Sequence, residues 1–301
     1  MDYRQLHSFV VLAEVLHFGK AAVQLNITQP ALSQHIKALE QSLGIPLFSR
    51  DKRHVSLTFE GQQLLEDARI AITHYDNILE NARSLRLGKK GQIKLGYVGS
   101  SILDPVLAML INSYRKHKPD IEIVIEEHNV SEQLTLLLNH QLDIALVRSP
   151  VPHFLELEYL DVVTRRLDAV LPRSHPLASE QKISLSALSD ATFLVQQDPP
   201  GVGLGWSTLY ACQQAGFVPQ KIQFTRDVSV AVGLVSMGMG VTLVPETQRS
   251  VMITDVNYCA LEDAAASTTL TFSWQQRSKN KALADFIHYL KALTHSTSTE
   301  K

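Results

Sequence analysis

The chain has 301 residues, of which 45% are hydrophobic and 19% charged, and this predicts about two domains with ample apolar surface for packed cores. The formal net charge of −2 excludes a general nucleic-acid coat, so any DNA binding must come from a local patch. With two cysteines, the chain has too few for a disulfide framework. It has no basic-then-apolar run at the N-terminus, which excludes a secretory leader, and no apolar stretch near ~20 residues, which excludes a membrane span. These features predict a cytoplasmic protein.

The first residues predict two short helices. Leu6, Phe9 and Ala13 follow helical spacing with polar residues between them. Gly19 then allows a turn, and a second short helix carries the small residues Ala21 and Ala22 inward.

A third helix follows, and its ends are well marked. Thr28 is a natural N-cap, Pro30 suits the first turn because its missing N–H costs nothing there, and Gly44 ends the helix. Four aliphatic residues share the inward face: Leu32, Ile36, Leu39 and Leu43.

The opposite face of this third helix carries polar residues suited to DNA. Gln29, Ser33 and Lys37 are spaced four residues apart and project together, with Gln34 beside them. Glutamine can read adenine, serine can contact base or phosphate, and lysine holds phosphate. The residues in its N-terminal half would enter the major groove of a duplex.

Residues 46–58 form two short β runs around a basic turn, which predicts a wing on the DNA backbone. A small helical bundle with solvated charges is the alternative. The alanine pair, the threonine cap and the basic wing favour a winged helix-turn-helix over residues 1–58.

Residues 59–91 predict a long linker helix and a hinge. Thr58 can cap the helix, Glu60 suits the positive end of its dipole, and a basic hinge follows at residues 88–91. Apolar residues hold a heptad seam: Leu64, Ala68, Ala71, Tyr75, Ile78, Ala82 and Leu85, widened by Leu65, Ile72 and Leu79. An amphipathic helix lying on its own domain would also show such a seam. The length of the pattern favours pairing between two chains.

From Gln92 the pattern changes to alternating strands and helices, which predicts an α/β region with a mainly parallel sheet. The expected strands are residues 93–98, 121–127, 142–147, 193–196, 222–225, 241–244 and 270–274. The expected helices are residues 102–117, 131–140, 205–215, 228–237 and 279–293.

An internal repeat divides this α/β region into two lobes. The strand–helix–strand pattern of residues 119–147 returns in residues 219–244. Two similar lobes imply a cleft between them, where small ligands usually sit. Crossovers are expected near residues 160–163 and 266–269. The lobe boundaries follow: lobe 1 is residues 92–161 and 268–301, and lobe 2 is residues 162–267.

Two features of the cleft have open interpretations. Gly99, Ser100 and Ser101 end the first strand just before an expected helix, so they form either an anion site or plain helix capping. Arg148 ends the third strand and supplies either positive charge to a ligand or a hinge ion pair. The glycine-rich residues 199–206 lack the Walker lysine and a dinucleotide fingerprint. We expect them to shape the pocket wall through Val202 and Leu204.

The pattern contains no catalytic constellation. The 12 histidines are scattered without a His-Glu-x-x-His motif, and there is no Gly-x-Ser-x-Gly elbow. We therefore expect no catalytic residues, no metal and no cofactor. Cys212 and Cys259 leave a thiol switch as an alternative, but Cys212 falls inside an apparent helix and neither has a basic setting.

The residues of the first three helices and the wing resemble the signature of LysR-type transcriptional regulators. The matching motif begins at Phe18, passes through Ala21-Ala22 and residues 28–33, and ends at Arg50. The resemblance covers essentially the whole chain. The residues that it places on DNA are Thr28, Gln29, Pro30, Ser33, Gln34 and Lys37 in the groove, with Arg50 and Arg53 on the backbone. Many relatives carry arginine where this chain has Gln34.

The resemblance also implies a periplasmic-binding-protein-like effector domain of two lobes behind the winged helix-turn-helix. Relatives that sense small carboxylates hold the acid group with a hydroxyl residue at the position of Ser100. The residue that opens the helix after the second strand often helps, and Val130 stands there with Ser131 beside it. The expected effector contacts are Gly99, Ser100, Ser101, Val130, Ser131, Arg148, Val202, Leu204 and Val228. The family dimerises through the linker helix, and two dimers usually join.

Three hypotheses follow. The first is a regulator that binds promoter DNA and a small anionic effector and makes or breaks no bond. The second keeps the DNA binding but gives the C-terminal region only an assembly role, without a ligand. The third is an enzyme with an appended DNA-binding arm, which the pattern does not support.

Overall fold

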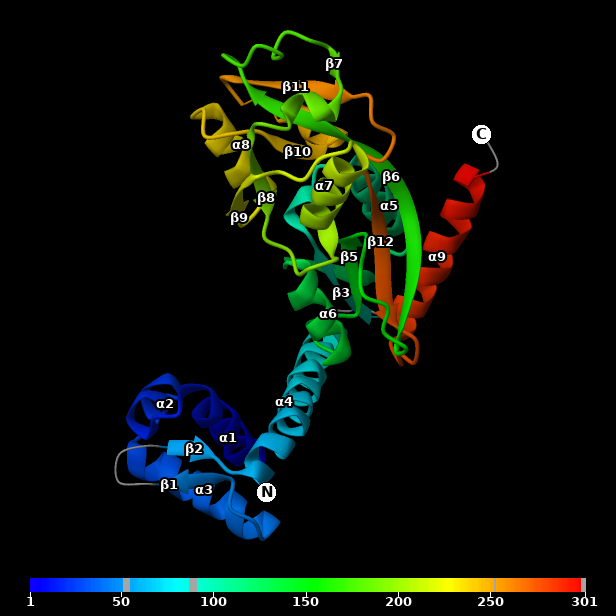
Figure 1. The fold of residues 1–301 in the computed structure, drawn as a ribbon. Helices are drawn as coiled ribbons and strands as arrows, with labels where there is room; N and C mark the ends of the chain where they lie inside the picture. The colour runs from blue at the N-terminus through cyan, green and yellow to red at the C-terminus, as the bar shows by residue number, and fades with distance from the viewer. Residues whose placement is uncertain (51–54, 87–90, 252, 299–301) are drawn as a thin grey trace. The chain divides into compact units, whose positions relative to one another are not determined.

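The computed structural model describes residues 1–50, 55–86, 91–251 and 253–298 (Figure 1). The chain divides into two compact units, Met1–Arg83 and Ser84–Lys301. Each unit has its own hydrophobic core, and the larger unit has separate core clusters in its two lobes.

The first unit opens with a helical triad. Its helices are α1 (Tyr3–Val15), α2 (Phe18–Gln24) and α3 (Gln29–Leu43). The expected turn at Gly19 is wrong, because Gly19 lies inside α2 and the chain reverses at Leu16, which adopts a left-handed φ of 48°. Ala21 and Ala22 are buried between the helices, as predicted.

The ends of α3 agree with the prediction. The Thr28 Oγ1 atom accepts a hydrogen bond from the N–H of Ala31, and Gly44 ends the helix in the left-handed region at φ 73°. Leu32, Ile36 and Leu39 are fully buried. Leu43 was expected on the same inward face, but it is 38% exposed because the last turn extends past the core.

A two-stranded wing follows α3. Strands β1 (Phe48–Arg50) and β2 (Val55–Leu57) pair antiparallel, and the basic tip at residues 51–54 lies outside the described residues. The Glu40 carboxylate of α3 accepts hydrogen bonds from the N–H groups of Leu47 and Phe48 at 2.9 and 3.2 Å. One side chain therefore ties the start of the wing to the back of α3.

The linker helix α4 spans Phe59–Arg86. Thr58 caps it, because its Oγ1 atom accepts a hydrogen bond from the N–H of Gly61 at 2.9 Å. The seam divides in two. Its N-terminal members, including Leu64 and Ala68, pack on the core of the first unit. Its later members, including Ile78 and Leu79, are exposed in this single chain.

In the described part of the second unit, an eight-stranded sheet runs through both lobes, and two further strands pair separately in lobe 2. The strands are β3 (Gly91–Tyr97), β4 (Ile121–Glu127), β5 (Ile144–Arg148), β6 (Leu157–Pro172), β7 (Lys182–Ile183), β8 (Thr192–Gln196), β9 (Lys221–Thr225), β10 (Thr242–Pro245), β11 (Val256–Leu261) and β12 (Ser267–Gln275). The helices are α5 (Pro105–His117), α6 (Val130–Leu138), α7 (Gly203–Gln214), α8 (Val228–Ser236) and α9 (Lys281–Ser298). Short 3₁₀ turns are η1 (Gly99–Ser101), η2 (Leu185–Leu188) and η3 (Glu246–Ser250).

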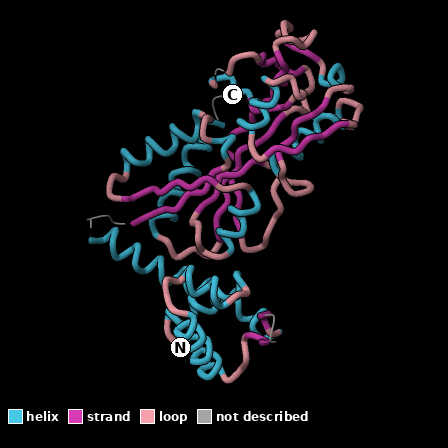
Figure 2. The backbone as a smooth tube through the Cα atoms, turned by 90° about the vertical axis from the view of Figure 1, so that its left-hand side faces the viewer, coloured by secondary structure: helices cyan, strands magenta, loops and turns pink. Residues whose placement is uncertain are grey.

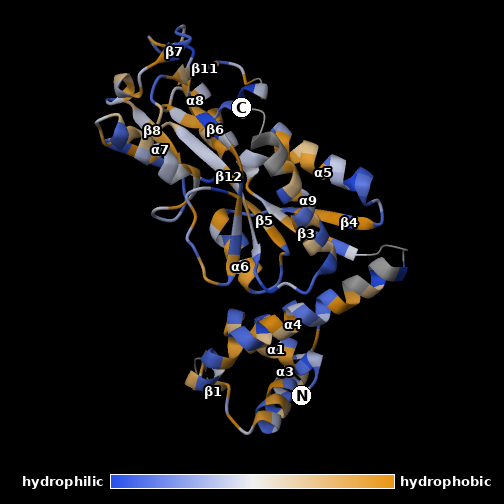
Figure 3. Ribbon diagram, turned by 90° about the vertical axis from the view of Figure 1, so that its right-hand side faces the viewer, coloured by the Kyte–Doolittle hydropathy of each residue, from blue (hydrophilic) through white to orange (hydrophobic). Residues whose placement is uncertain are grey.

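Lobe 1 is a three-layer sandwich around β5, which is buried on both faces. Ile144 and Leu146 face a cluster that contains residues of α5 and α9, whereas Ala145 and Val147 face α6. The edge strand β4 mixes isoleucine with glutamate, whereas β5 is apolar from Ile144 to Val147 (Figure 3). Such continuous apolar runs are typical of strands covered by helices on both sides.

The internal repeat is confirmed. Strand β3 pairs in parallel with β4 and β5, and β8 pairs in parallel with β9 and forms a parallel bridge to Val241, just before β10. Asn129 caps α6 and Asp227 caps α8, and each side chain accepts the N–H three residues on at 2.9 Å. Helix α6 begins at Val130, one residue before its predicted start, and α8 begins at Val228, as predicted.

Two long strands join the lobes. Figure 2 shows strands running from one lobe into the other. β6 pairs with β12 up to Arg166 and with β10 from Leu167, so it changes partner a few residues after the expected crossover at residues 160–163. β6 and β12 pair antiparallel with each other, β12 also pairs antiparallel with β5, and β6 pairs antiparallel with β10 and β11. The sheet is therefore mixed, whereas a mainly parallel sheet was expected. Phe272 and Trp274 of β12 are core residues.

Candidate functional site

The outward face of α3 carries the residues predicted to meet DNA. Gln29, Gln34 and Lys37 are exposed and Ser33 is half-buried. Thr28 and Pro30 are exposed at the start of the helix. The buried leucine and isoleucine face fixes the rotation of α3, and this rotation presents the polar residues together to the outside. Arg53 lies outside the described residues, and of Arg50 only the backbone is described.

A cavity of about 410 Å³ lies between the two lobes. Lobe 1 contributes the ends of β3 and β5 and the start of α6, and lobe 2 contributes the end of β8 and the starts of α7 and α8. The lining residues are Val98, Gly99, Ser100, Glu127, His128, Asn129, Val130, Glu132, Arg148, Gln196, Asp198, Leu204, Arg226, Asp227 and Val228. The carboxyl ends of parallel strands meet here, which is where α/β sheets bind ligands.

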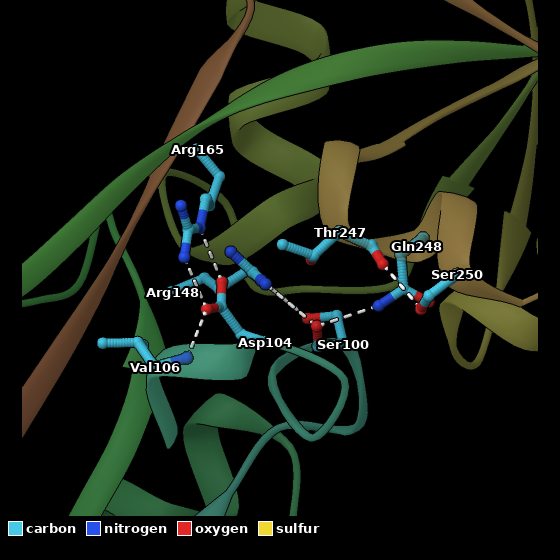
Figure 4. A network of polar contacts seen from close by, with 8 residues as sticks. All are labelled: Ser100, Asp104, Val106, Arg148, Arg165, Thr247, Gln248 and Ser250. Atoms are coloured by element: carbon cyan, nitrogen blue, oxygen red, sulfur yellow. Dashed lines mark hydrogen bonds and ion pairs between the residues drawn. The ribbon is translucent and has the colours of Figure 1, made fainter. Parts of the chain in front are cut away.

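Arg148 is the central charge of this cavity. Its side chain is only 1% exposed, its Nε atom donates to the Oγ of Ser100 at 2.8 Å, and its Nη2 atom donates to the backbone oxygen of Ser100 at 2.9 Å (Figure 4). The Nη1 atom is buried and has no hydrogen-bond partner among the described residues. A buried N–H donor of a charged group is costly to leave unpaired.

Electrostatics around Arg148 follow from its burial. Desolvation lowers the pKa of Arg148 to about 10. The negative charge of Asp104 opposes this shift, and the positive charge of Arg165 adds to it. A guanidinium with this pKa is still charged at neutral pH. Arg148 therefore brings a full positive charge to the lining of the cavity, and its Nη1 donor is unpaired in the described part of the chain.

The negative charge nearest to Arg148 is already paired. The fully buried Asp104 carboxylate accepts hydrogen bonds from the Nε and Nη2 atoms of Arg165 at 2.9 and 2.8 Å and caps α5 through the N–H of Val106. Burial raises the pKa of Asp104, but the bonds from Arg165 and Val106 and the charges of Arg165 and Arg148 outweigh it and hold the pKa below 3.8. Arg165 thus takes the ion pair that Arg148 could otherwise have made.

Gln248 of η3 reaches across from lobe 2. Its Nε2 atom donates to the backbone oxygen of Ser100 at 3.0 Å, beside the Arg148 contact (Figure 4). Ser100 is therefore held by a cation from its own lobe and by an amide from the other. This arrangement couples the position of lobe 2 to the residue that lines the cavity floor.

Most residues expected at the cleft lie there. Gly99, Ser100, Val130, Arg148, Leu204 and Val228 line the cavity. The Ser101 hydroxyl instead donates to the oxygen of Val98, and Ser131 lies on a separate shallow surface. Val202 packs in the core cluster that contains Val130.

The predicted helix start at residue 102 is wrong. Residues 99–101 form a 3₁₀ turn, and α5 begins at Pro105 with Asp104 as its cap. The Asp104 side chain accepts a hydrogen bond from the N–H of Val106 at the start of α5. The positive character of the Ser100 loop comes from Arg148 rather than from a helix dipole.

The sequence-based reasoning missed Gln196, Asp198 and Gln248. Gln196 ends β8, which occupies in lobe 2 the place of β3 in lobe 1. The repeat therefore contained a signal, since both strand ends face the cleft. No sequence signal pointed to Gln248, because η3 lies far along the chain from Ser100 and contains no motif.

The two cysteines are core residues. Burial raises the pKa of Cys212 to about 12 and also raises that of Cys259. Arg249 lies near Cys259, contrary to the expectation that no basic group would, but it pairs with Asp168. Both thiols are thus disfavoured as thiolates, the reactive form.

Within the described ranges, no three His, Cys, Asp or Glu side chains gather in a way that could hold a metal ion. None of the described helices is both long enough and apolar enough to cross a membrane.

Residues 3–62 match the lysR family of bacterial regulatory helix-turn-helix proteins, and residues 86–294 match the LysR substrate binding domain. The chain belongs to the LysR family. It is a LysR-type transcriptional regulator with an effector-binding domain, and the winged first unit and the two-lobed second unit are the two parts of that architecture.

Individual relatives agree with this LysR assignment. The HTH-type transcriptional regulator AlsR of Bacillus subtilis (strain 168) is 33% identical over 296 residues, which cover 96% of this chain and 95% of AlsR. The crystal structure of CbnR, a LysR family transcriptional regulator also solved with its target DNA, has a TM-score of 0.77 at 21% identity and covers 97% of this chain and 99% of CbnR. The BenM effector binding domain with its effector benzoate has a TM-score of 0.60 at 22% identity and covers 71% of this chain and 96% of that domain. The structural likenesses show the shared fold.

Proposed function

We propose that this LysR-type regulator binds a small carboxylate between its lobes and that this binding controls how it acts on promoter DNA. The observation that supports the proposal is the guanidinium of Arg148, a residue that lines the cavity: it is buried and charged, and its Nη1 donor has no partner among the described residues. A carboxylate is the ligand group that matches such a donor best. BenM, which shares the fold, was solved with benzoate.

The Ser100 hydroxyl completes the proposed carboxylate site. It accepts from the Nε of Arg148, and among the described residues no acceptor takes its own proton. A carboxylate in the cavity would receive one hydrogen bond from Arg148 and one from Ser100. Because Gln248 also contacts Ser100, ligand binding would favour one arrangement of the lobes.

For the first unit, we propose duplex DNA as the partner. Gln29, Ser33 and Gln34 would read base edges, while Lys37 would hold phosphate. Thr28 and Pro30 would lie at the groove, and Arg50 and Arg53 of the wing would hold the backbone. The solved complex of CbnR with its target DNA supports this use of the shared fold. A chromosomal target places the protein in the cytoplasm.

We further propose that two chains pair through α4 and that such dimers associate into a tetramer. The support comes from the exposed half of the heptad seam, where Ile78 is 65% and Leu79 is 56% exposed. Large apolar side chains in a sustained heptad are typical of helix pairing. Two recognition helices could then address two half-sites.

The effector proposal is tested with matched carboxylates and carboxamides on the full chain. Benzoate and butyrate, compared with benzamide and butyramide, should raise the melting temperature in a concentration-dependent way. At about a hundred times its Kd a ligand adds about 2.7 kcal/mol of stability, which corresponds to several degrees. The amides should give little shift, since they lack the negative charge.

The matched variants are Arg148→Met, which should abolish the carboxylate shift, and Arg115→Met, an exposed control on α5 that should keep it. If neither these acids nor a wider carboxylate panel shifts melting or operator binding, the regulator acts without an effector. Equal shifts by acid and amide would contradict the anionic site. Turnover of any compound would contradict a regulator that only binds its ligand.

A further inference from the structure

Of the described side chains that have a buried polar atom without a partner, Arg148 and Gln196 are the two that line the cavity. Gln196 ends β8 and is 7% exposed, and neither its Nε2 nor its Oε1 atom has a partner among the described residues. A buried side-chain amide in which neither the nitrogen nor the oxygen atom is paired is uncommon in folded proteins. Its presence here calls for a partner outside the chain.

The position of Gln196 is set by close backbone packing. The helix α7 crosses its carbonyl at Gly205, where an added Cβ atom would lie 2.3 Å from the Gln196 oxygen. Only glycine permits this approach. Packing therefore holds the backbone of Gln196 at the cavity.

Arg148 and Gln196 line the same cavity from opposite lobes. With respect to the described residues, Arg148 has an unpaired cationic donor, and Gln196 has an unpaired donor and an unpaired acceptor on one amide. The apolar side chains Val130, Leu204 and Val228 also line this cavity. A ligand that satisfies both lobes needs two polar groups joined by a carbon framework.

The charges around the cavity restrict the second polar group of the ligand. Four carboxylates line the cavity: Glu127, Glu132, Asp198 and Asp227. Three of them accept backbone N–H groups, as Asp198 does from Gly205 at 2.9 Å, so they are fixed in place. Apart from Arg148, the cationic side chains in the lining are Arg226 and, when protonated, His128. A second carboxylate on the ligand would be repelled.

An ammonium group would satisfy only half of Gln196. It can donate to Oε1, but it cannot accept from Nε2. A hydroxyl or a carboxamide both donates and accepts. These two neutral groups are the ones that pair with both atoms of the Gln196 amide.

We propose that the ligand of this cleft is a monocarboxylate that carries a hydroxyl or carboxamide group, with the carboxylate at Arg148 and the neutral group on Gln196. Gln196 is then the specificity-determining residue of the site. The carboxylate half rests on the proposed function above, and the Gln196 half rests on its own burial and lack of a partner.

The test uses a four-carbon series on the full chain: butyrate, γ-hydroxybutyrate, succinamate, γ-aminobutyrate and succinate, each with shorter and longer homologues. Affinity is measured by calorimetry. Among ligands of the carbon-chain length that binds best, the hydroxy acid and the amide acid should bind roughly tenfold more tightly than the unsubstituted acid. The diacid should bind more weakly than either.

Gln196→Met is the decisive variant, because methionine keeps the size and removes both polar atoms. This variant should bind the hydroxy and amide acids about as tightly as the unsubstituted acid, and its affinity for the unsubstituted acid should be unchanged. It should also melt at or above the temperature of the unmodified protein without ligand, since no hydrogen bond is lost. Gln213→Met, an exposed position on α7, is the matched control and should keep the preference.

The outcomes separate the two proposals. If no carboxylate binds, the proposed function fails. If acids bind through Arg148 but the hydroxyl or amide gives no advantage, or Gln196→Met leaves the advantage intact, the Gln196 assignment alone is overturned. Tightest binding of γ-aminobutyrate would also overturn it and assign the acidic lining as the second contact. Lower melting of Gln196→Met without ligand would show that Gln196 has a structural partner.

Discussion

The Nε atom of Arg148 donates a hydrogen bond to the Oγ atom of Ser100 over 2.8 Å, so the cation and the hydroxyl form one unit at the base of the cleft. Arg148 ends β5 and Ser100 follows β3, and the parallel pairing of these strands brings the two residues together. The guanidinium also orients the hydroxyl, whose proton can then point into the cavity.

Ser100→Ala should weaken carboxylate binding by roughly tenfold, because it removes one donor and leaves the Nε of Arg148 unpaired. The measurement is calorimetry with benzoate. Ser101→Ala is the matched control, since the Ser101 hydroxyl donates to Val98 and does not line the cavity. It should cost about 1 kcal/mol of stability and keep the ligand response. An equal loss of binding in both variants would contradict a direct role for Ser100.

Asp104→Asn should destabilise the second unit by about 2–4 kcal/mol, because it leaves the cations of Arg165 and Arg148 without their buried counter-charge. Urea unfolding at neutral pH measures this. Asp190→Asn, at an exposed position, should have little effect.

The same carboxylate sets part of the acid sensitivity. The pKa of Asp104 is lowered in the folded state, so its stabilising contribution is complete above the ordinary value of 3.8 and is lost as the pH falls through the folded pKa. The unmodified protein should therefore lose stability below about pH 4 more steeply than Asp104→Asn. Parallel acid-unfolding curves for the two proteins would show that Asp104 does not contribute.

Gln29→Ala should lower affinity for the operator by about tenfold or more and leave affinity for random DNA nearly unchanged, because glutamine reads base edges. Lys37→Ala should weaken both and reduce the slope of log affinity against log salt by about 1, because lysine holds phosphate. Fluorescence anisotropy at several salt concentrations separates the two. Gln24→Ala on the exposed face of α2 is the control, and equal losses on both DNAs for Gln29→Ala would exclude base reading.

Ile78→Asp should convert a dimer into monomers, because it places a charge within the apolar seam of α4. Light scattering during size-exclusion chromatography reports the mass. Gln63→Asp adds the same charge at an exposed polar position of α4 and should keep the dimer. A dimer that survives Ile78→Asp would place the pairing surface elsewhere.

Local patterns were enough to predict most elements. The bounds of β4 and the caps of α3 depend on residues close in sequence, and the predictions for them are confirmed. The turn at Leu16 and the exposure of Leu43 could not be predicted this way, because the first needs a left-handed residue that is not glycine and the second depends on where the core ends. The heptad seam favoured pairing of α4 with a second chain. The structure shows that its first half packs on the first unit.

The cleft shows the same division. Residue patterns along the chain were enough to predict the two-lobed repeat, the recognition helix and a hydroxyl and an arginine at strand ends, because periodicity and strand order are local properties. The folded structure was needed to show that Arg165 pairs with Asp104, which leaves the Nη1 of Arg148 unpaired among the described residues. It was also needed to show that Gln196 lines the cavity and that Gln248 contacts Ser100 from the other lobe. These pairings join residues far apart in the chain, and burial, which makes an unpaired group costly, exists only once the lobes have folded.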